Sequence, residues 1–260
     1  MKSLLIALLF SISSSFANPI DISCKQLTYK SAPKIEADQF VCHQEYAIAY
    51  SWTSRNPIYT TEFLDASHTG DLPRTNDFAV DPAIDKFHVA TPNDYKNTKD
   101  GCGPIVGKRT STCDQGHMTP HQDFSSCQPC VSQSFFMSNI VPQYYKNNEG
   151  IWKGMEMKIR GYAANHPKGV YVITGPVYLT KTPRTIGKNK VWVPDYLFKI
   201  SINAETGNSI AFYIPNNEQH DLSKFVVNLE TIEKASGIIF DSSLDKKKIA
   251  NYQEWLSQTK

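Results

Sequence analysis

The sequence lacks an apolar run long enough to cross a membrane, which takes about 20 consecutive apolar residues in a helix. Its N-terminal run, Leu4 to Phe10, is far shorter, and no later stretch approaches that length. We therefore expect no membrane span. A strong charge of one sign is missing too, since 27 basic and 25 acidic side chains leave the 260 residues with a formal net charge of +2. This balance does not indicate a polyanionic partner, although a local cluster of Lys and Arg could still bind one.

The chain also has no internal repeat, no low-complexity tract and no linker, because its 15 Pro and 13 Gly residues are scattered. These absences exclude repeat architectures and leave no point at which the chain would divide into domains. With 40% hydrophobic and 20% charged residues, the composition also excludes a disordered chain. We expect residues 18–260 to form a single domain.

The first 17 residues have the pattern of a secretory signal. Lys2 precedes the apolar run, and Ser15-Phe16-Ala17 supplies small residues for cleavage. We expect residues 1–17 to be a signal peptide and the mature protein to be secreted or periplasmic. Removal of Lys2 lowers the formal net charge from +2 to +1.

Six cysteines remain after this cleavage, and an even number in an exported chain favours disulfide bonds. Six cysteines allow about 15 pairings, and spacing alone does not choose among them. Loop closure favours pairing between nearest neighbours. We therefore expect the bonds Cys24–Cys42, Cys102–Cys113 and Cys127–Cys130.

Hydrophobic patterning predicts strands followed by helices without strict alternation. We expect strands at 44–53, 58–64, 134–141, 169–175, 177–179, 191–203 and 209–215, a helix at 148–164, and a mostly helical tail from residue 221. The irregular stretch 66–113 is long enough to be functional or crosslinked. This order indicates an α+β fold with a mainly antiparallel central sheet and flanking helices.

His117 lies in the string Asp114-Gln115-Gly116-His117, in a turn between expected strands. A histidine can act as a general base near neutral pH. The alternative is a loop histidine that only caps a backbone carbonyl, which is how we interpret His43, His68, His88, His166 and His220.

On the expected helix, Asn148, Trp152, Glu156 and Arg160 follow one another at intervals of four and therefore share one face. An amide oxygen with waters and phosphate oxygens is a reasonable site for Mg²⁺. The alternative is a helix N-terminal Asn followed by an exposed Glu156–Arg160 pair.

Together these segments resemble the DNA/RNA non-specific endonuclease family, whose active site is a ββα-metal finger. That family has Asp-Arg-Gly-His, then a strand that ends in Asn-Ile/Met-x-Pro-Gln, then an Asn with Trp four residues later and Glu four beyond. The corresponding segments here are 114–117, 138–143 and 147–156, with supporting matches at 73–82, 172–177 and 212–216. The resemblance covers residues 44–220.

The resemblance implies a role for each matching residue. His117 would be the general base that activates water, and Asn148 the sole direct protein ligand of Mg²⁺, for which Mn²⁺ could substitute. Glu156 would order metal-bound waters, while Arg74 and Arg160 would hold phosphate oxygens. Such a site reads the backbone, so DNA and RNA would both be substrates with little sequence preference.

Further residues complete the expected site. Asp114 belongs to the catalytic motif, and the expected substrate-binding residues are Gln115, Asn139, Lys181 and Arg184. The last two lie in a stretch without Asp or Glu that either contacts phosphates or is simply a solvated hairpin loop. Gln115 departs from the family, which has Arg there, and Arg109 or Lys108 could reach in as a substitute.

Cys127-Gln128-Pro129-Cys130 allows two other interpretations. The pair could be redox-active, or Cys113, Cys127 and Cys130 could bind Zn²⁺ with His117 or His121. No thioredoxin-like pattern surrounds the pair, and a structural disulfide suits an exported protein.

We therefore expect an exported, Mg²⁺-dependent endonuclease. The alternatives are a catalytically weakened or inactive nucleic-acid-binding member of the same fold and a disulfide-crosslinked extracellular binding protein. Nothing in the sequence indicates the oligomeric state.

Overall fold

The computed structural model describes residues 24–27, 29, 32–99 and 101–260. The expected signal peptide, residues 1–17, lies outside this part of the chain. Among the described residues, no helix combines the length and the apolar character that crossing a membrane requires.

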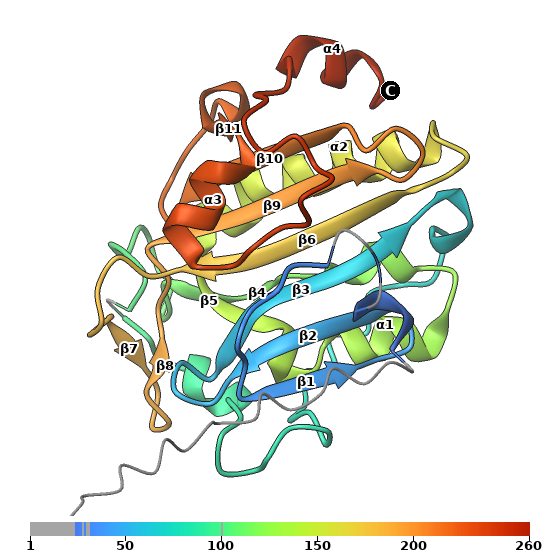
Figure 1. The fold of residues 1–260 in the computed structure, drawn as a ribbon. Helices are drawn as coiled ribbons and strands as arrows, with labels where there is room; N and C mark the ends of the chain where they lie inside the picture. Colours follow the sequence, from blue (N-terminus) through green and yellow to red (C-terminus); the bar gives the residue numbers. More distant parts are fainter. Residues whose placement is uncertain (1–23, 28, 30–31, 100) are drawn as a thin grey trace, which may run out of the picture.

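A seven-stranded sheet forms the centre of the fold, in the order β1-β2-β3-β6-β9-β10-β11, and all its neighbouring strands are antiparallel (Figure 1). Its strands are β1 (Gln39–Cys42), β2 (Tyr46–Ser51), β3 (Asn56–Leu64), β6 (Val170–Val177), β9 (Tyr196–Asn203), β10 (Ser209–Pro215) and β11 (Val226–Val227). This confirms the predicted α+β class with a mainly antiparallel sheet.

Helices cover both faces of the sheet because its side chains alternate between two apolar layers. On one face, α2 (Lys153–Ala164) buries Met155 and Ile159 against Val172 and Phe212. On the other, α3 (Leu229–Ser236) lies across the sheet (Figure 1). Its Leu229 and Ile232 belong to the same buried cluster as Phe198. α4 (Tyr252–Ser257) follows and adds Trp255 to the α2 layer.

Residues 65–169 form one excursion between β3 and β6, which pair directly through Leu64 and Val170. Within the excursion, β4 (Cys113–His117) pairs with β5 (Ile140–Tyr144), and β5 leads into a π-helical turn (Asn147–Trp152) that continues as α2. This is a ββα arrangement. α1 (Gln128–Ser134) lies between the two strands in sequence.

Short elements make up the rest. β7 (Thr185–Ile186) and β8 (Val191–Trp192) form a separate hairpin. The 3₁₀ turns are Lys25–Leu27, Ala66–His68, Pro92–Tyr95, His121–Phe124, Met137–Asn139 and Leu222–Phe225.

Four predicted elements are wrong in part. The strand expected at 134–141 begins only at Ile140, after the end of α1 and a 3₁₀ turn, because a short apolar run does not distinguish a strand from a buried helix. The strand expected at 191–203 is divided at Pro194, which has no N–H to donate. No separate strand forms at 177–179, where β6 ends, and the tail contains the edge strand β11 as well as helices.

All three predicted disulfides are present: Cys24–Cys42, Cys102–Cys113 and Cys127–Cys130. The described part of the chain has no free cysteine. Bonded sulfurs are poor metal ligands, so the zinc interpretation is wrong. The last of the three bonds closes the first turn of α1.

Candidate active site

A cleft of about 790 Å³ opens beside the ββα arrangement. The excursion between β3 and β6 supplies its walls, from Gly70–Arg74, β4 and the start of α2. Six residues singled out from the sequence line this cleft: Arg74, Asp114, Gln115, His117, Asn148 and Glu156.

His117 is the last residue of β4, and its imidazole is only 7% exposed. The ring lies edge-on to Phe135, with centroids 4.9 Å apart, and Nε2 has no hydrogen-bond partner among the described residues. Burial lowers the pKa of His117 well below its usual value, and the nearby Arg74 cation lowers it further. The imidazole is therefore neutral near pH 7, with a free nitrogen that can accept a proton.

Gly116 explains how β4 and β5 fit together just before this histidine. A Cβ at this position would lie 2.2 Å from Oε1 of Gln143, so only glycine leaves room for that side chain. Gln143 donates from Nε2 to Oδ1 of Asn147 at 2.7 Å. The strand pair is thereby linked to the π-helical turn.

The two adjacent asparagines of that turn have different tasks. Asn147 is fully buried, and its Nδ2 donates to the carbonyls of Pro215 and Asn217, each at 3.0 Å, which ties the turn to the end of β10. Asn148 lines the cleft. The expected regular helix from Asn148 is wrong, because Gly150 interrupts it with φ −103° and ψ −109°.

Asn148 is held by Asp114. Its Nδ2 donates to Oδ2 of Asp114 at 3.0 Å, while Arg109 donates to Oδ1 of the same carboxylate at 2.9 Å. Burial raises the pKa of Asp114, whereas these two hydrogen bonds favour its charged form. The bond leaves Oδ1 of Asn148, the oxygen that a metal ion would need, unused by Asp114.

Glu156 adds a carboxylate to the same cleft. Its Oε1 is buried without a hydrogen-bond partner in the described part of the chain. Burial raises the pKa of Glu156 to about 7, although Lys199 and Arg160 oppose this shift. An unpaired carboxylate oxygen beside Asn148 is chemically suited to a divalent cation with its waters.

Arg74 is the arginine that lines the cleft, whose wall also includes Lys153. Its guanidinium lies over the ring of Phe135 at 5.0 Å and that of Phe78 at 5.9 Å, and its Nε donates to Asn76. These two cation–π contacts restrict where the guanidinium can lie, and its planar set of donors suits it to hold phosphate oxygens.

Arg160 does not line the cleft. Its guanidinium donates to Asp123 at 2.6 Å and to Gln122 at 2.8 Å; Asp123 is buried, and the Arg160 side chain is only 13% exposed. The alternative of an exposed Glu156–Arg160 pair is therefore wrong, and the guanidinium that we expected to hold phosphate oxygens is paired with Asp123. Met155 and Ile159 of the same helix pack into the core, whereas Glu156 lines the cleft.

Three expected substrate-binding residues do not line the cleft either. Asn139 is fully buried and bonds to Thr119 and to the carbonyl of Ser134, so it holds the backbone between α1 and β5. Lys181 and Arg184 are exposed in the loop before β7, outside the lining of the cleft. Gln115 does line the cleft, with its Nε2 directed to the sulfur of Met137 at 3.5 Å.

Sequence reasoning missed three residues of this region. His121 lines the cleft, and burial together with Arg74 lowers its pKa to about 4. Its position four residues after His117 could have indicated a second histidine in the cleft, but we interpreted it only as a possible zinc ligand. Asp123 and Glu62 lie in the core beneath Glu156, and no local motif marks them.

The fold and the cleft place the chain in the class of ββα nuclease folds, and comparison with known proteins gives the family. The model of the family described as "DNA/RNA non-specific endonuclease" matches residues 24–247 of this chain. The chain belongs to the DNA/RNA non-specific endonuclease family.

Several relatives are named nucleases. The chain is 33% identical to nuclease EXOG, mitochondrial, of Xenopus laevis, over 82% of this chain and 60% of that protein. It is 30% identical to endonuclease G, mitochondrial, of Homo sapiens (78% and 69%) and 31% identical to nuclease C1 of Cunninghamella echinulata var. echinulata (80% and 85%). The match thus spans about three fifths of the EXOG relatives.

A solved structure has the same fold. A chain in the crystal structure of the EndoG/EndoGI complex aligns with a TM-score of 0.70 at 25% identity, covering 82% of this chain and 89% of that one. The likeness extends well beyond the cleft and includes the central sheet.

Proposed function

We propose that this protein is an exported, Mg²⁺-dependent endonuclease that hydrolyses phosphodiester bonds of DNA and RNA. The observation that carries the proposal is the meeting of a neutral, unpartnered His117 nitrogen with the Asn148 amide and the Arg74 cation in one cleft. The family of the chain and the names of its relatives support the same conclusion.

His117 acts as the general base in the first step of the reaction. Its Nε2 takes a proton from the attacking water, which becomes nucleophilic as its O–H bond breaks. Phe78 and Phe135 pack around the ring and keep bulk water away from it. Arg74 holds the non-bridging oxygens of the phosphate in line with this water.

The donor set fits Mg²⁺. Among the described residues, no cluster of three or more His, Cys, Asp or Glu side chains forms a metal site, so a protein cage is not available. Mg²⁺ keeps several waters and takes few protein oxygens, which suits Oδ1 of Asn148 with Glu156 ordering the waters. When bound, the ion would neutralise charge that develops on the phosphate and the leaving oxygen.

Recognition of the backbone accounts for a broad substrate range. The charged groups of the cleft suit a phosphate, which DNA and RNA share, and contacts to phosphates carry no base sequence. Gln115, in place of the family Arg, favours a second candidate, a nucleic-acid-binding protein with weak or no turnover.

Export rests on the N-terminal pattern of Lys2, the run Leu4 to Phe10 and Ala17, together with the three disulfides. Fractionation of the producing cells and N-terminal sequencing tests it. A mature chain that begins at Asn18 outside the cytoplasm is expected, and a cytoplasmic chain that retains Met1 would contradict it.

One assay tests the activity. The purified mature protein is incubated with plasmid DNA and with total RNA, with Mg²⁺ or with EDTA. Degradation of both substrates that EDTA abolishes is expected, and His220→Ala, which changes an exposed histidine outside the cleft, should behave like the parent. Binding of nucleic acid without cleavage would favour the nucleic-acid-binding protein. If the protein neither binds nor cleaves nucleic acid, a binding protein for other ligands would be favoured.

A further inference from the structure

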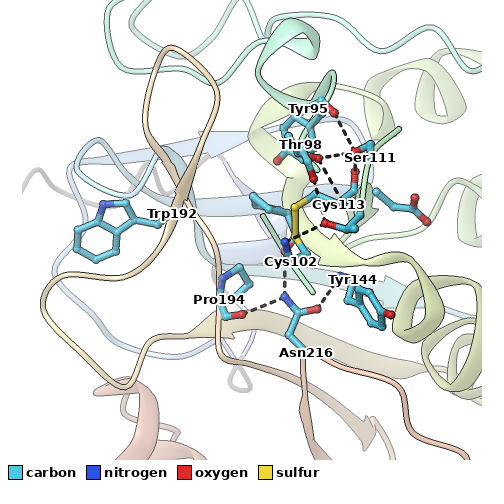
Figure 2. The surroundings of a disulfide bond; sticks show 12 residues. Tyr95, Thr98, Cys102, Ser111, Cys113, Tyr144, Trp192, Pro194 and Asn216 are labelled. Carbon is cyan, nitrogen blue, oxygen red and sulfur yellow. Dashed lines mark hydrogen bonds between the residues drawn. A yellow bond between two sulfur atoms is a disulfide. The ribbon is translucent and has the colours of Figure 1, made fainter. Parts of the chain in front are cut away.

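The loop between Cys102 and Cys113 is exposed at its tip and fixed at its base. The two cysteines are 3% and 4% exposed, and Thr112, the residue before Cys113, is fully buried. Oγ1 of Thr112 accepts from the Cys102 N–H at 3.2 Å and donates to the Thr98 carbonyl at 3.0 Å, and Ser111 donates to the Cys113 carbonyl (Figure 2). The disulfide and these bonds fix where the end of the loop emerges.

Arg109 lies at that end, and three contacts hold its guanidinium. It donates to Asp114 at 2.9 Å and to Glu149 at 3.0 Å, and it lies over the ring of Tyr145 at 4.1 Å. Both carboxylates line the cleft, whereas Arg109 itself does not. Arg109 therefore contacts residues that form the wall of the cleft, and it does not face a ligand bound inside the cleft.

The contact continues to the expected metal ligand. Asp114 uses Oδ1 for Arg109 and Oδ2 for Nδ2 of Asn148, at 3.0 Å. Because an amide group is planar, a fixed Nδ2 also fixes the direction of Oδ1. Without Arg109, the half-buried Asp114 would lose its only cationic hydrogen-bond donor in the described part of the chain and would hold the amide less firmly.

We propose that Arg109 is a positioning residue, delivered by the disulfide-closed loop, which orients the Asn148 amide through Asp114. The inference rests on the proposed function, in which Asn148 holds the metal ion. The inference also bears on Gln115, which stands where the family has Arg. The chain has a cation beside Asp114, but this cation reaches the site from the neighbouring loop and works through a carboxylate.

The test measures metal affinity without nucleic acid. Mn²⁺ binding to the full mature protein is followed by isothermal titration calorimetry for the parent, Arg109→Gln and the control Lys96→Gln. The control removes the same charge from an exposed position that does not line the cleft. Loss of the group that directly holds a metal ligand typically weakens metal binding about 10- to 100-fold. Arg109 acts one contact further out, through Asp114, so Arg109→Gln should weaken Mn²⁺ binding by about tenfold, at the lower end of this range. The control should bind like the parent.

Kinetics separate positioning from direct substrate contact. At saturating Mn²⁺, Arg109→Gln should regain most of the parental kcat with an unchanged KM for DNA. A raised KM with parental Mn²⁺ affinity would mean that Arg109 contacts the substrate and would overturn the inference. Unchanged affinity and kinetics would overturn it as well.

A second perturbation tests the loop. Replacing both Cys102 and Cys113 with Ser should weaken Mn²⁺ binding, and adding Arg109→Gln should cause little further loss, since the two changes disrupt one chain of contacts. Fully additive losses would contradict the delivery of Arg109 by the loop.

The outcomes also separate this inference from the proposed function. A parent that binds Mn²⁺ but does not cleave nucleic acid would refute the function alone, and the affinity of Arg109→Gln would still decide the positioning role. A parent that binds no Mn²⁺ would overturn the inference itself.

Discussion

Replacing Arg160 with Met should cost the fold far more than the loss of an ordinary ion pair. The guanidinium and its partner Asp123 are 13% and 4% exposed and lie 2.6 Å apart. Arg160→Met leaves the Asp123 carboxylate buried without its cation. Breaking one side of a buried pair typically costs about 3–5 kcal/mol.

Neighbouring charges increase this cost. Glu62 lies close enough for Asp123 and Glu156 to raise its pKa, after burial as the main cause, and Arg160 opposes that shift. Without Arg160, Lys199 is the cation that still lowers the pKa of Glu62 and of Glu156, while the Asp123 carboxylate raises both. For a domain of this size each kcal/mol lowers Tm by about 2–4 °C, so Tm should fall by about 6–20 °C.

Thermal unfolding by circular dichroism at pH 7.5 measures this fall. Lys234→Met is the matched control, because Lys234 and Glu230 form an ion pair at 2.9 Å with side chains 73% and 37% exposed. Solvent screens such an exposed pair, so the control should lose no more than a few degrees. A Tm for Arg160→Met that equals that of the control would refute the burial argument.

Three further predictions concern the cleft. His117→Ala should lower kcat by about 10²–10⁴-fold with Tm and Mn²⁺ affinity unchanged, and added imidazole should restore part of the rate; parental turnover would place the base elsewhere. Gln115→Arg should raise kcat/KM about tenfold or more if this position faces the phosphate, whereas an unchanged rate in an active parent would show that the contact with Met137 directs the side chain away. His121 has a folded pKa of about 4, below its unfolded value, so the fold loses stability as pH falls from about 6.5 to 4. His121→Gln should reduce this loss in urea unfolding measured at pH 7 and pH 4.5, and an unchanged difference between the two pH values would contradict it.

Local patterns predicted the parts of the fold that are locally determined. β10, an apolar run that ends at a proline, has the predicted bounds, 209–215. The start of β3 was missed, since Asn56 joins the strand while its Nδ2 donates to Trp192 and Tyr178, more than a hundred residues away. A sequence shows a local pattern such as that of β10, but it does not show a contact between segments that lie far apart in the chain.

The same distinction applies to the site. His117 and Asn148 occur within recognisable strings, and the structure brings both to the cleft. Arg160 was placed correctly on the helix but assigned to phosphate, because its partner Asp123 comes from a distant turn. Asn139 was assigned to substrate for a similar reason, as its buried bonds cross between segments.

The pairing of β3 with β6 has a consequence for how the chain reaches this structure. Residues 65–169 must all be present before Leu64 can meet Val170, so the central seam of the sheet closes a loop of about one hundred residues. Closing such a loop costs entropy before any contact repays it, which makes folding slow. The hairpin of β9 and β10 needs only a short turn and can form early, whereas the seam follows the excursion. The pairing of β3 with β6 should therefore be among the last features of the sheet to form during refolding, and its backbone amides should gain protection from hydrogen exchange after those of the β9–β10 hairpin.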